Sequence, residues 1–442
     1  MMKQYDSYKD SGVEWIGKIP SHWSVFRIRY NYYLKGRIGW QGLKADEFID
    51  EGPYLITGTD FINGKVNWDT CYHISQERYD EAPEIHVKEG DLLITKDGTV
   101  GKTAYIDNVP GPSSLNSHLL IIRPFNEKCN NLFLQYVINS QIFDSFMRIF
   151  QTGSIMASIS QEKFCDFRLP LPSKKEQRSI LLYLDKKCEE IDKAIATQEK
   201  RVELLKELRQ NIITKAVTRG INSDVPLKDS GVEWIGEVPE HWKVMKMNHA
   251  LRSIADVNHY MPDSVSEGYP YIMTGDLKEY LSEIDLDSCK RISEEDYKGL
   301  IVKSKAQKGD VIFARYATIG TVCYVDVEKD FVVSYSCVTI RPNSIILDGL
   351  FLFYYLQTHT FFEDVSQSIN SNTQGNVGIE SLSASRLIVP PISEQQEIVS
   401  FIETKTARLD KSIEKAEHQI ELLQELKQSI ITEVVTGKRK VD

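Results

Sequence analysis

A glycine-rich stretch at 98–103 ends in Gly-Lys-Thr, as phosphate-binding loops do. In such loops, backbone N–H groups and the lysine hold the phosphates of a nucleotide. The full pattern also needs a glycine five residues before Gly101, and Lys96 stands there. A related stretch later in the chain has Thr321 where this one has Lys102. We therefore predict a tight turn between two strands here, and not a nucleotide site.

A second stretch could hold a metal ion. Pro262-Asp263, followed by Asp296-Tyr297-Lys298, loosely matches the PD…DxK pattern of metal-dependent nucleases. Two carboxylates and a lysine could hold a divalent cation beside a phosphodiester. The matching residues of the first half, RYD at 78–80, lack the lysine. So short a pattern also arises by chance, so an autonomous nuclease is kept as an alternative, tested by incubating the purified chain with DNA and Mg²⁺.

No catalytic set recurs in both halves of the chain. His118 has no counterpart in the second half, and the GxSxG, HExxH, NPPY and DPPY motifs are absent. Three polar loops do recur: 57–60 with 274–276, 95–99 with 314–318, and 151–154 with 370–376. Hydroxyls, amides and an occasional Lys or Arg on loops of a rigid scaffold suit contacts with base edges and phosphates. The same residue types are also ordinary in turns, so the residues alone leave the two interpretations even.

These loops lie in a duplicated chain. KDSGVEWIGKIPSHWSV at 9–25 returns as KDSGVEWIGEVPEHWKV at 228–244, and a long helical stretch occurs at Ser173–Val217 and again at Pro391–Val435. Between these landmarks the halves share only scattered matches, such as PYLITGTDF with PYIMTGDL. DLLIT, TAYI and HLLIIR have strand length, and 131–148 and 348–363 read as helices. The chain is therefore two copies of a β-rich globular unit followed by a long helix.

Apolar residues in both long stretches recur at the spacing of a heptad coiled coil. The predicted seam is Leu184, Ile191, Ile195, Val202, Leu205, Ile212, Ile402, Leu409, Ile413, Ile420, Leu423 and Ile430. Each helix of about 45 residues would be roughly 67 Å long. Two similar halves most easily pack about a pseudo-two-fold axis, which makes the helices antiparallel and returns the end of the second helix to the first W-I-G segment. A coiled coil with another chain is the alternative, and the tail from Gly437 is expected to fray.

Composition indicates an ordinary soluble protein, with 41% hydrophobic and 26% charged residues. No apolar run reaches the length of a membrane helix, and the N-terminal stretch lacks the apolar core of a signal peptide, so we expect a cytoplasmic protein. The seven cysteines are scattered without a CxxC pair, which favours free thiols over a metal site. A net charge of −10 is an objection to nucleic-acid binding, which usually needs a basic face.

The chain resembles the DNA-specificity subunits of type I restriction–modification enzymes over essentially its whole length. The resemblance rests on the W-I-G-x-x-P-x-H-W opening of both halves, the T-G-T-D and G-D-L-L-I-T-K-D-G-T-V-G-K runs, and the L-P-x-P-x(3)-E-Q-x(2)-I entry to the long helices. Pro390-Pro391-Ile392 departs slightly from that entry. The resemblance implies an α+β fold with an internal pseudo-two-fold duplication. Two β-rich target-recognition domains, 1–171 and 221–389, would be joined by two long antiparallel coiled-coil helices, 172–220 and 390–437, before a tail at 438–442.

The resemblance also implies a non-catalytic, sequence-specific DNA-binding subunit of a restriction system. Each domain would read one half of a bipartite, asymmetric site in double-stranded DNA, and the helices would set the spacer and dock two methyltransferase subunits. Partner subunits, including restriction motor subunits, would use S-adenosylmethionine, ATP and Mg²⁺, while this chain would bind no cofactor. Partners could also supply phosphate contacts, which answers the charge objection. Besides the nuclease, a scaffold that joins proteins without touching DNA is the alternative, and a mobility shift with the methyltransferase present separates the two.

We expect the DNA contacts on the polar loops. In the first unit these are Arg37, Trp40, Gln41, Lys44, Thr57, Thr59, Lys96, Asp97, Thr99, Asn116 and His118. In the second unit they are Thr274, Arg315, Tyr316, Asn370, Asn372 and Gln374.

Overall fold

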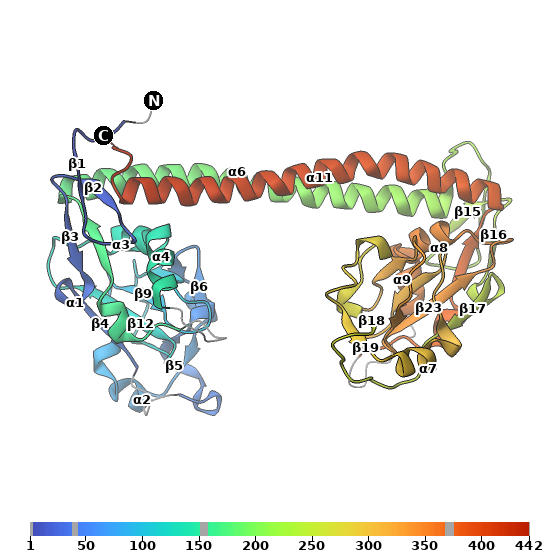
Figure 1. Ribbon diagram of the computed structural model, residues 1–442, viewed down its shortest axis with the longest axis horizontal. Coiled ribbons are helices and arrows are strands. Elements are labelled where there is room, and N and C mark those ends of the chain that lie inside the picture. The colour runs from blue at the N-terminus through green and yellow to red at the C-terminus, as the bar shows by residue number, and fades with distance from the viewer. Residues whose placement is uncertain (1–2, 38–42, 151–157, 367–374, 442) are drawn as a thin grey trace. The chain divides into compact units, whose positions relative to one another are not determined.

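The structure is a computed structural model that describes residues 3–37, 43–150, 158–366 and 375–441. It divides into two compact units: unit 1 is Met1–Glu199 with His418–Asp442, and unit 2 is Lys200–Glu417. Each unit combines a β-rich globular part with a section of both long helices, α6 (Lys174–Arg219) and α11 (Ile392–Val435) (Figure 1). The division between the units falls inside the helices, so the domain bounds expected from the sequence remain a prediction.

Unit 1 is built on two sheets. A four-stranded antiparallel sheet has the order β10-β9-β12-β4, and a three-stranded sheet has the order β11-β5-β8, with β11 parallel to β5. The strands are β1 (Tyr8–Asp10), β2 (Lys18–Pro20), β3 (Ser24–Arg27), β4 (Tyr32–Gly36), β5 (Ile49–Ile56), β6 (Phe61–Ile62), β7 (Lys65–Val66), β8 (Tyr72–His73), β9 (Leu92–Thr95), β10 (Thr103–Tyr105), β11 (Ser113–Leu115), β12 (Leu119–Pro124) and β13 (Arg168–Leu171). The helices are α1 (Ile28–Asn31), α2 (Gln76–Asp80), α3 (Asn131–Ile138), α4 (Gln141–Phe150) and α5 (Gln161–Cys165).

The four-stranded sheet is apolar on both faces because each face meets its own core. Leu92 and Ile94 of β9 lie in the core shared with α3 and α6, whereas Leu93 between them lies in the core shared with the three-stranded sheet. Alternation along the strand accounts for this division, since successive side chains point to opposite faces. The antiparallel pairing of β9 with β10 confirms that the 98–103 loop is a turn between strands.

Unit 2 repeats this architecture. Its sheets have the orders β17-β23-β20-β21 and β19-β18-β22. The strands are β14 (Leu227–Asp229), β15 (Glu237–Pro239), β16 (Lys243–Lys246), β17 (Leu251–Ala255), β18 (Tyr269–Ile272), β19 (Lys290–Ile292), β20 (Val311–Ala314), β21 (Val322–Tyr324), β22 (Val332–Val333), β23 (Cys337–Pro342) and β24 (Arg386–Val389). The helices are α7 (Glu294–Ser304), α8 (Gly349–Leu356), α9 (His359–Ser366) and α10 (Ile379–Ala384). The expected α+β duplication is confirmed, sheet by sheet.

The long helices pair antiparallel inside each unit. In unit 2, Lys206 Nζ lies 2.8 Å from Glu417 and Arg209 Nε lies 2.9 Å from Asp410, so residue numbers rise along α6 as they fall along α11. In unit 1, Lys427 Nζ lies 2.6 Å from an Asp192 carboxylate oxygen. The predicted seam residues are buried at Leu184, Ile191, Val202, Ile402, Ile413 and Ile430 and half-buried at Ile195, Leu205, Ile212, Leu409, Ile420 and Leu423.

The first W-I-G segment holds the start of α6. Glu176 accepts hydrogen bonds from His22 Nε2 at 2.8 Å and from Trp23 Nε1 at 3.0 Å. It also forms a capping box with Ser173, each side chain accepting a bond from the other's backbone N–H. Partial burial opposes ionisation of Glu176, but these hydrogen bonds outweigh it and lower its pKa to about 2.

Unit 2 uses the matching residues at the start of α11. His241 Nε2 lies 2.8 Å from a Glu394 oxygen, and Gln395 Nε2 donates to the Ile346 carbonyl at 2.8 Å. Gln177 makes the equivalent bond in unit 1. The repeated Glu-Gln pair therefore ties each long helix to its own globular part, which accounts for the near-identity of these segments.

Two sequence expectations about helices were wrong. The stretches 131–148 and 348–363 are each two helices, because Ser140 and Thr358 begin a new helix: their hydroxyls accept the N–H groups of Ile142 and Phe361. The predicted return of the end of the second long helix to the first W-I-G segment is confirmed, since Val434 and Val435 share a core with Ile16 and Trp23.

The chain's last described residues are packed where fraying was expected. Tyr8 Oη donates to the Gly437 carbonyl at 3.0 Å, and Lys440 N donates to the Lys3 carbonyl at 2.9 Å. All seven cysteines are free. Within the described residues, no helix is both long and apolar enough to cross a bilayer.

Candidate nucleic-acid interface

The predicted contact loops of unit 1 meet at one edge of its four-stranded sheet. Strands β4 and β9 end at this edge, and the antiparallel β12 begins there, with Leu119 opposite Thr95 and Leu120 opposite Gly36. The backbone ties the loops together, since Lys96 N donates to the His118 carbonyl at 2.9 Å. A loop cluster of this kind places exposed polar side chains on a rigid base.

Four of the predicted residues form one polar cluster at that edge. Lys96 Nζ lies 3.0 Å from Asp97 Oδ2, and His118 Nδ1 lies 3.3 Å from the same oxygen. The Asn116 side chain accepts the backbone N–H of His118 at 3.1 Å. The His118 side chain is 63% exposed, so the cluster presents to solvent an imidazole that is positioned by Asp97.

The threonines lie on the neighbouring loop. Thr57 Oγ1 and Thr59 Oγ1 are 2.6 Å apart, and the buried Asp60 accepts from both the N–H and the hydroxyl of Thr57. Lys102 Nζ donates to the Gly58 carbonyl at 3.1 Å, so this lysine joins two loops. The Thr99 carbonyl accepts a hydrogen bond from the Thr95 hydroxyl.

Arg37 differs from the others because it points inward. It is 5% exposed, its Nε donates to the Leu115 carbonyl at 2.8 Å, and its Nη2 donates to Ser114 Oγ at 3.0 Å. Burial and the nearby Arg78 guanidinium lower the pKa of Arg37. Its contact with DNA stays a prediction that requires the loop to rearrange. Lys44 is exposed, and Trp40 and Gln41 lie outside the described residues.

The same edge of unit 2 carries a different cluster. Arg315, directly after β20, is 6% exposed, and its Nη2 donates to Asp256 and to the Tyr335 carbonyl at 3.3 Å and lies 3.0 Å from His259 Nε2. The guanidinium carbon also lies 5.0 Å from the ring centroid of Tyr316. Thr274 is half-buried in the loop after β18, and Asn370, Asn372 and Gln374 lie outside the described residues.

Sequence reasoning missed Asp256, His259 and Tyr335. The signal that could have found Asp256 is its place directly after a strand, as Arg37 follows β4 in unit 1.

The nuclease-like residues of unit 2 are engaged locally. Tyr260 Oη donates to Asp296 at 3.1 Å, and Lys298 Nζ pairs with Glu294 at 2.7 Å on α7. Among the residues that the structure describes, no group of three or more His, Cys, Asp or Glu side chains could hold a metal ion.

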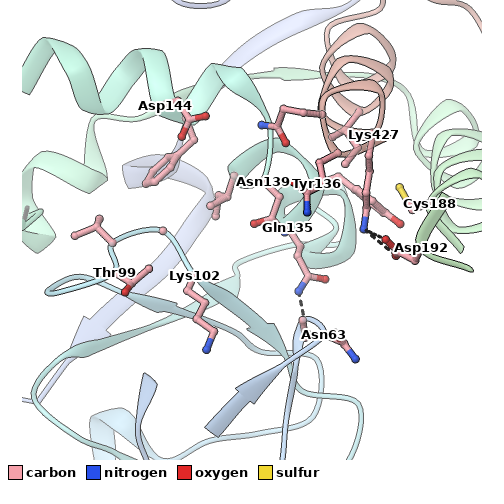
Figure 2. Close-up of a pocket in the computed structure, with 18 of the residues that line it drawn as sticks. Asn63, Thr99, Lys102, Gln135, Tyr136, Asn139, Asp144, Cys188, Asp192 and Lys427 are labelled. Atoms are coloured by element: carbon pink, nitrogen blue, oxygen red, sulfur yellow. Dashed lines mark hydrogen bonds and ion pairs between the residues drawn. The ribbon is translucent and has the colours of Figure 1, made fainter. Parts of the chain in front are cut away.

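A pocket of unit 1 is lined on one side by residues 99–102 of the turn between β9 and β10. It has a volume of about 960 Å³ and lies between the globular part and the helix pair (Figure 2). The Lys427–Asp192 ion pair closes one side, and Lys102 and Thr99 lie across the pocket from it. Of the predicted contact residues of unit 1 that the structure describes, Thr99 alone lines it. Burial raises the pKa of Asp144 in its wall.

A family model described as the type I restriction modification DNA specificity domain matches residues 41–206 and 242–422. The chain belongs to this family. The two matched regions cover both loop clusters. Membership gives the chain a role in DNA sequence specificity.

Curated relatives support this family assignment, and a solved structure supports the fold. The type I restriction enzyme MjaVIII specificity subunit of Methanocaldococcus jannaschii is 23% identical over 433 residues, covering 96% of this chain and 94% of that protein. The EcoBI specificity subunit of Escherichia coli is 24% identical over 436 residues, covering 96% of this chain and 88% of that protein. A chain from a study of complex assembly and conformational transition of the type I R-M system matches with a TM-score of 0.66 at 14% identity, over 94% of this chain and 98% of that one. This last match bears on the fold alone.

Proposed function

We propose that each globular part reads one half of a bipartite, asymmetric DNA site. The observation that carries the proposal is the repeated sheet edge with different side chains. Lys96 and Arg315 occupy equivalent positions, with equivalent backbone bonds to the loop before β12 or β23. Their neighbours differ, being Asp97 and His118 in unit 1 and Asp256 and His259 in unit 2. The same backbone with different hydrogen-bonding groups suits two readers of different bases.

The long helices would set the spacer between the half-sites and dock two methyltransferase subunits. Exposed leucines support docking: Leu204 and Leu208 on α6 are 54% and 47% exposed, and Leu422 and Leu426 on α11 are 50% and 47% exposed. Each pair is four residues apart, so both side chains lie on one helix face. Two matching apolar stripes would give two copies of one partner equivalent contacts.

Catalysis would belong to the partners. Methyltransferase and restriction motor subunits would use S-adenosylmethionine, ATP and Mg²⁺, and the complex would act in the cytoplasm. The description of the relatives as specificity subunits supports this division of labour. With a net charge of −10, this chain would depend on partner subunits for much of the phosphate attraction.

The test is the methylation pattern of the host genome with and without this gene. A two-part motif that disappears with the gene supports the proposal. Exchanging residues 26–167 for the equivalent unit of another family member should then change one half of the motif only. A change in both halves, or cleavage of DNA by the purified chain with Mg²⁺ alone, would contradict it.

A further inference from the structure

The unit 2 cluster contains an exposed histidine whose orientation is fixed by its neighbours. His259 lies on the loop between β17 and β18, and its side chain is 56% exposed. Its ring stacks on Tyr335, with centroids 5.2 Å apart and planes inclined by 27°. Its Nε2 lies 3.0 Å from Arg315 Nη2 and 3.3 Å from Asp256 Oδ2.

These contacts leave one ring nitrogen for an incoming ligand. Nε2 faces both Arg315 Nη2, which can only donate, and the Asp256 carboxylate, which accepts, so Nε2 has a partner in either tautomer. Within the described part of the chain, no hydrogen bond to Nδ1 is present. His259 therefore presents Nδ1 to whatever approaches the loop edge.

Asp256 and Tyr335 make this arrangement stable. Asp256 pairs with the same Arg315 nitrogen and compensates the charge of a guanidinium that is 6% exposed. The Tyr335 carbonyl accepts a further bond from that nitrogen, and the Tyr335 ring supports the imidazole. An imidazole held by three neighbours loses little side-chain freedom on binding.

We infer that His259 is a specificity-determining residue of unit 2, contacting a base edge through Nδ1. The inference rests on the proposed function of unit 2 as a DNA reader. In the major groove, each base pair presents its own pattern of donors and acceptors. A contact through Nδ1 would therefore discriminate between bases at one position of the second half-site. Arg315, Asp256 and Tyr335 act as positioning residues for this contact.

Two isosteric replacements separate reading through Nδ1 from a general role. Asparagine places its amide near the position of Nδ1, and glutamine places its amide near the position of Nε2. His259→Asn should keep the discrimination, whereas His259→Gln and His259→Ala should lose it about tenfold at one position, the loss expected for one hydrogen bond to a base. His359→Ala is the matched control, since His359 is an exposed histidine of the same unit, paired with Glu363 on α9.

The experiment uses the full chain expressed with its methyltransferase partners, and genome-wide sequencing of methylated sites. The inference is supported if His259→Ala admits further bases at one position of the second half-site while the first half-site, the spacer and His359→Ala keep the wild-type motif. An unchanged motif, a uniform loss of methylation at all sites, or retention by His259→Gln with loss by His259→Asn would each overturn it and leave the proposed function standing. A wild-type complex without any two-part motif would overturn both.

Discussion

Lengthening both long helices by four residues should lengthen the unread spacer of the DNA site and leave both half-sites unchanged. The variant carries four residues in the local pattern after Leu205 of α6 and four after Glu417 of α11. The Lys206–Glu417 pair and residues 206–417 of unit 2 then stay on one side of both insertions. The Asp192–Lys427 pair of unit 1 stays on the other side. Neither loop cluster is touched.

The expected size of the change follows from helix geometry. Four residues add about 6 Å of helix at about 1.5 Å per residue. A base-pair step is about 3.4 Å, so the added length admits at most about two base pairs. Four residues also turn the helix about 40° beyond a full turn, while one base pair turns DNA by about 35°. The added rotation of the helix matches one base pair, and its added length admits two. We therefore expect a spacer that is longer by one or two base pairs.

The assay is again the pattern of methylated sites in cells that carry the variant. A seven-residue insertion at the same points is the matched variant, because it keeps the heptad register that four residues interrupt and adds about 10.5 Å, or about three base pairs. Replacing four residues in place, without insertion, controls for sequence changes and should keep the original motif. An active four-residue variant with the original spacer would refute the idea that the helices set the distance.

Three further substitutions test contacts inside unit 1. Glu176→Gln should destabilise the unit by about 1 kcal/mol at neutral pH, a modest loss because solvent partly screens this carboxylate. The hydrogen bonds lower the pKa of Glu176 to about 2, so its stabilisation is present above pH about 4.5 and is lost as the pH falls toward 2. The melting curves of wild type and variant should therefore converge in acid, and curves that stayed apart would contradict the assignment. Asp91→Asn should cost about 2–4 kcal/mol, because Arg123 loses a buried carboxylate 2.7 Å away, and unchanged hydrogen exchange in β9 and β12 would count against this. Gly437→Ala should destabilise more than Gly12→Ala: both have φ near +70°, but only the added Cβ at 437 would lie 2.4 Å from a Pro20 carbon, and equal melting temperatures would show that the terminal packing contributes nothing.

The long helices could be predicted because their signals are local and repeated. Heptad spacing gives their existence, and the Ser173–Glu176 capping box lies in the sequence at the helix start. The break between α3 and α4 was missed because Ser140 interrupts an otherwise helical apolar pattern without ending it. Its hydroxyl acts as a cap only when the chain turns there, and tertiary packing decides that turn.

The sequence predicts where the loop edge lies, but not which side chains contact one another there. Polar residues directly after strands indicate an edge, and the structure brings Lys96, Asp97, Asn116 and His118 together there. The inward orientation of Arg37 could not be read from the sequence, because it depends on Ser114 and Leu115 of a strand in the other sheet. Long-range partners of this kind leave no periodic signal.

The two clusters suggest how one fold can read different DNA at small cost in stability. Both units keep a cation directly after the equivalent strand and hold its backbone in the same way. The neutralising carboxylate of Lys96 is the adjacent Asp97, whereas that of Arg315 is Asp256 from the loop after β17. Substitutions of exposed side chains such as His118 and His259 usually change stability by less than about 0.5 kcal/mol, whereas truncation in the apolar core beneath costs about 2–5 kcal/mol. The exposed side chains of the edge can therefore vary at lower cost than the sheets. Because each cation carries its own carboxylate, the edge adds little net positive charge, so its side chains can select bases while the attraction to phosphate comes from elsewhere in the assembled complex.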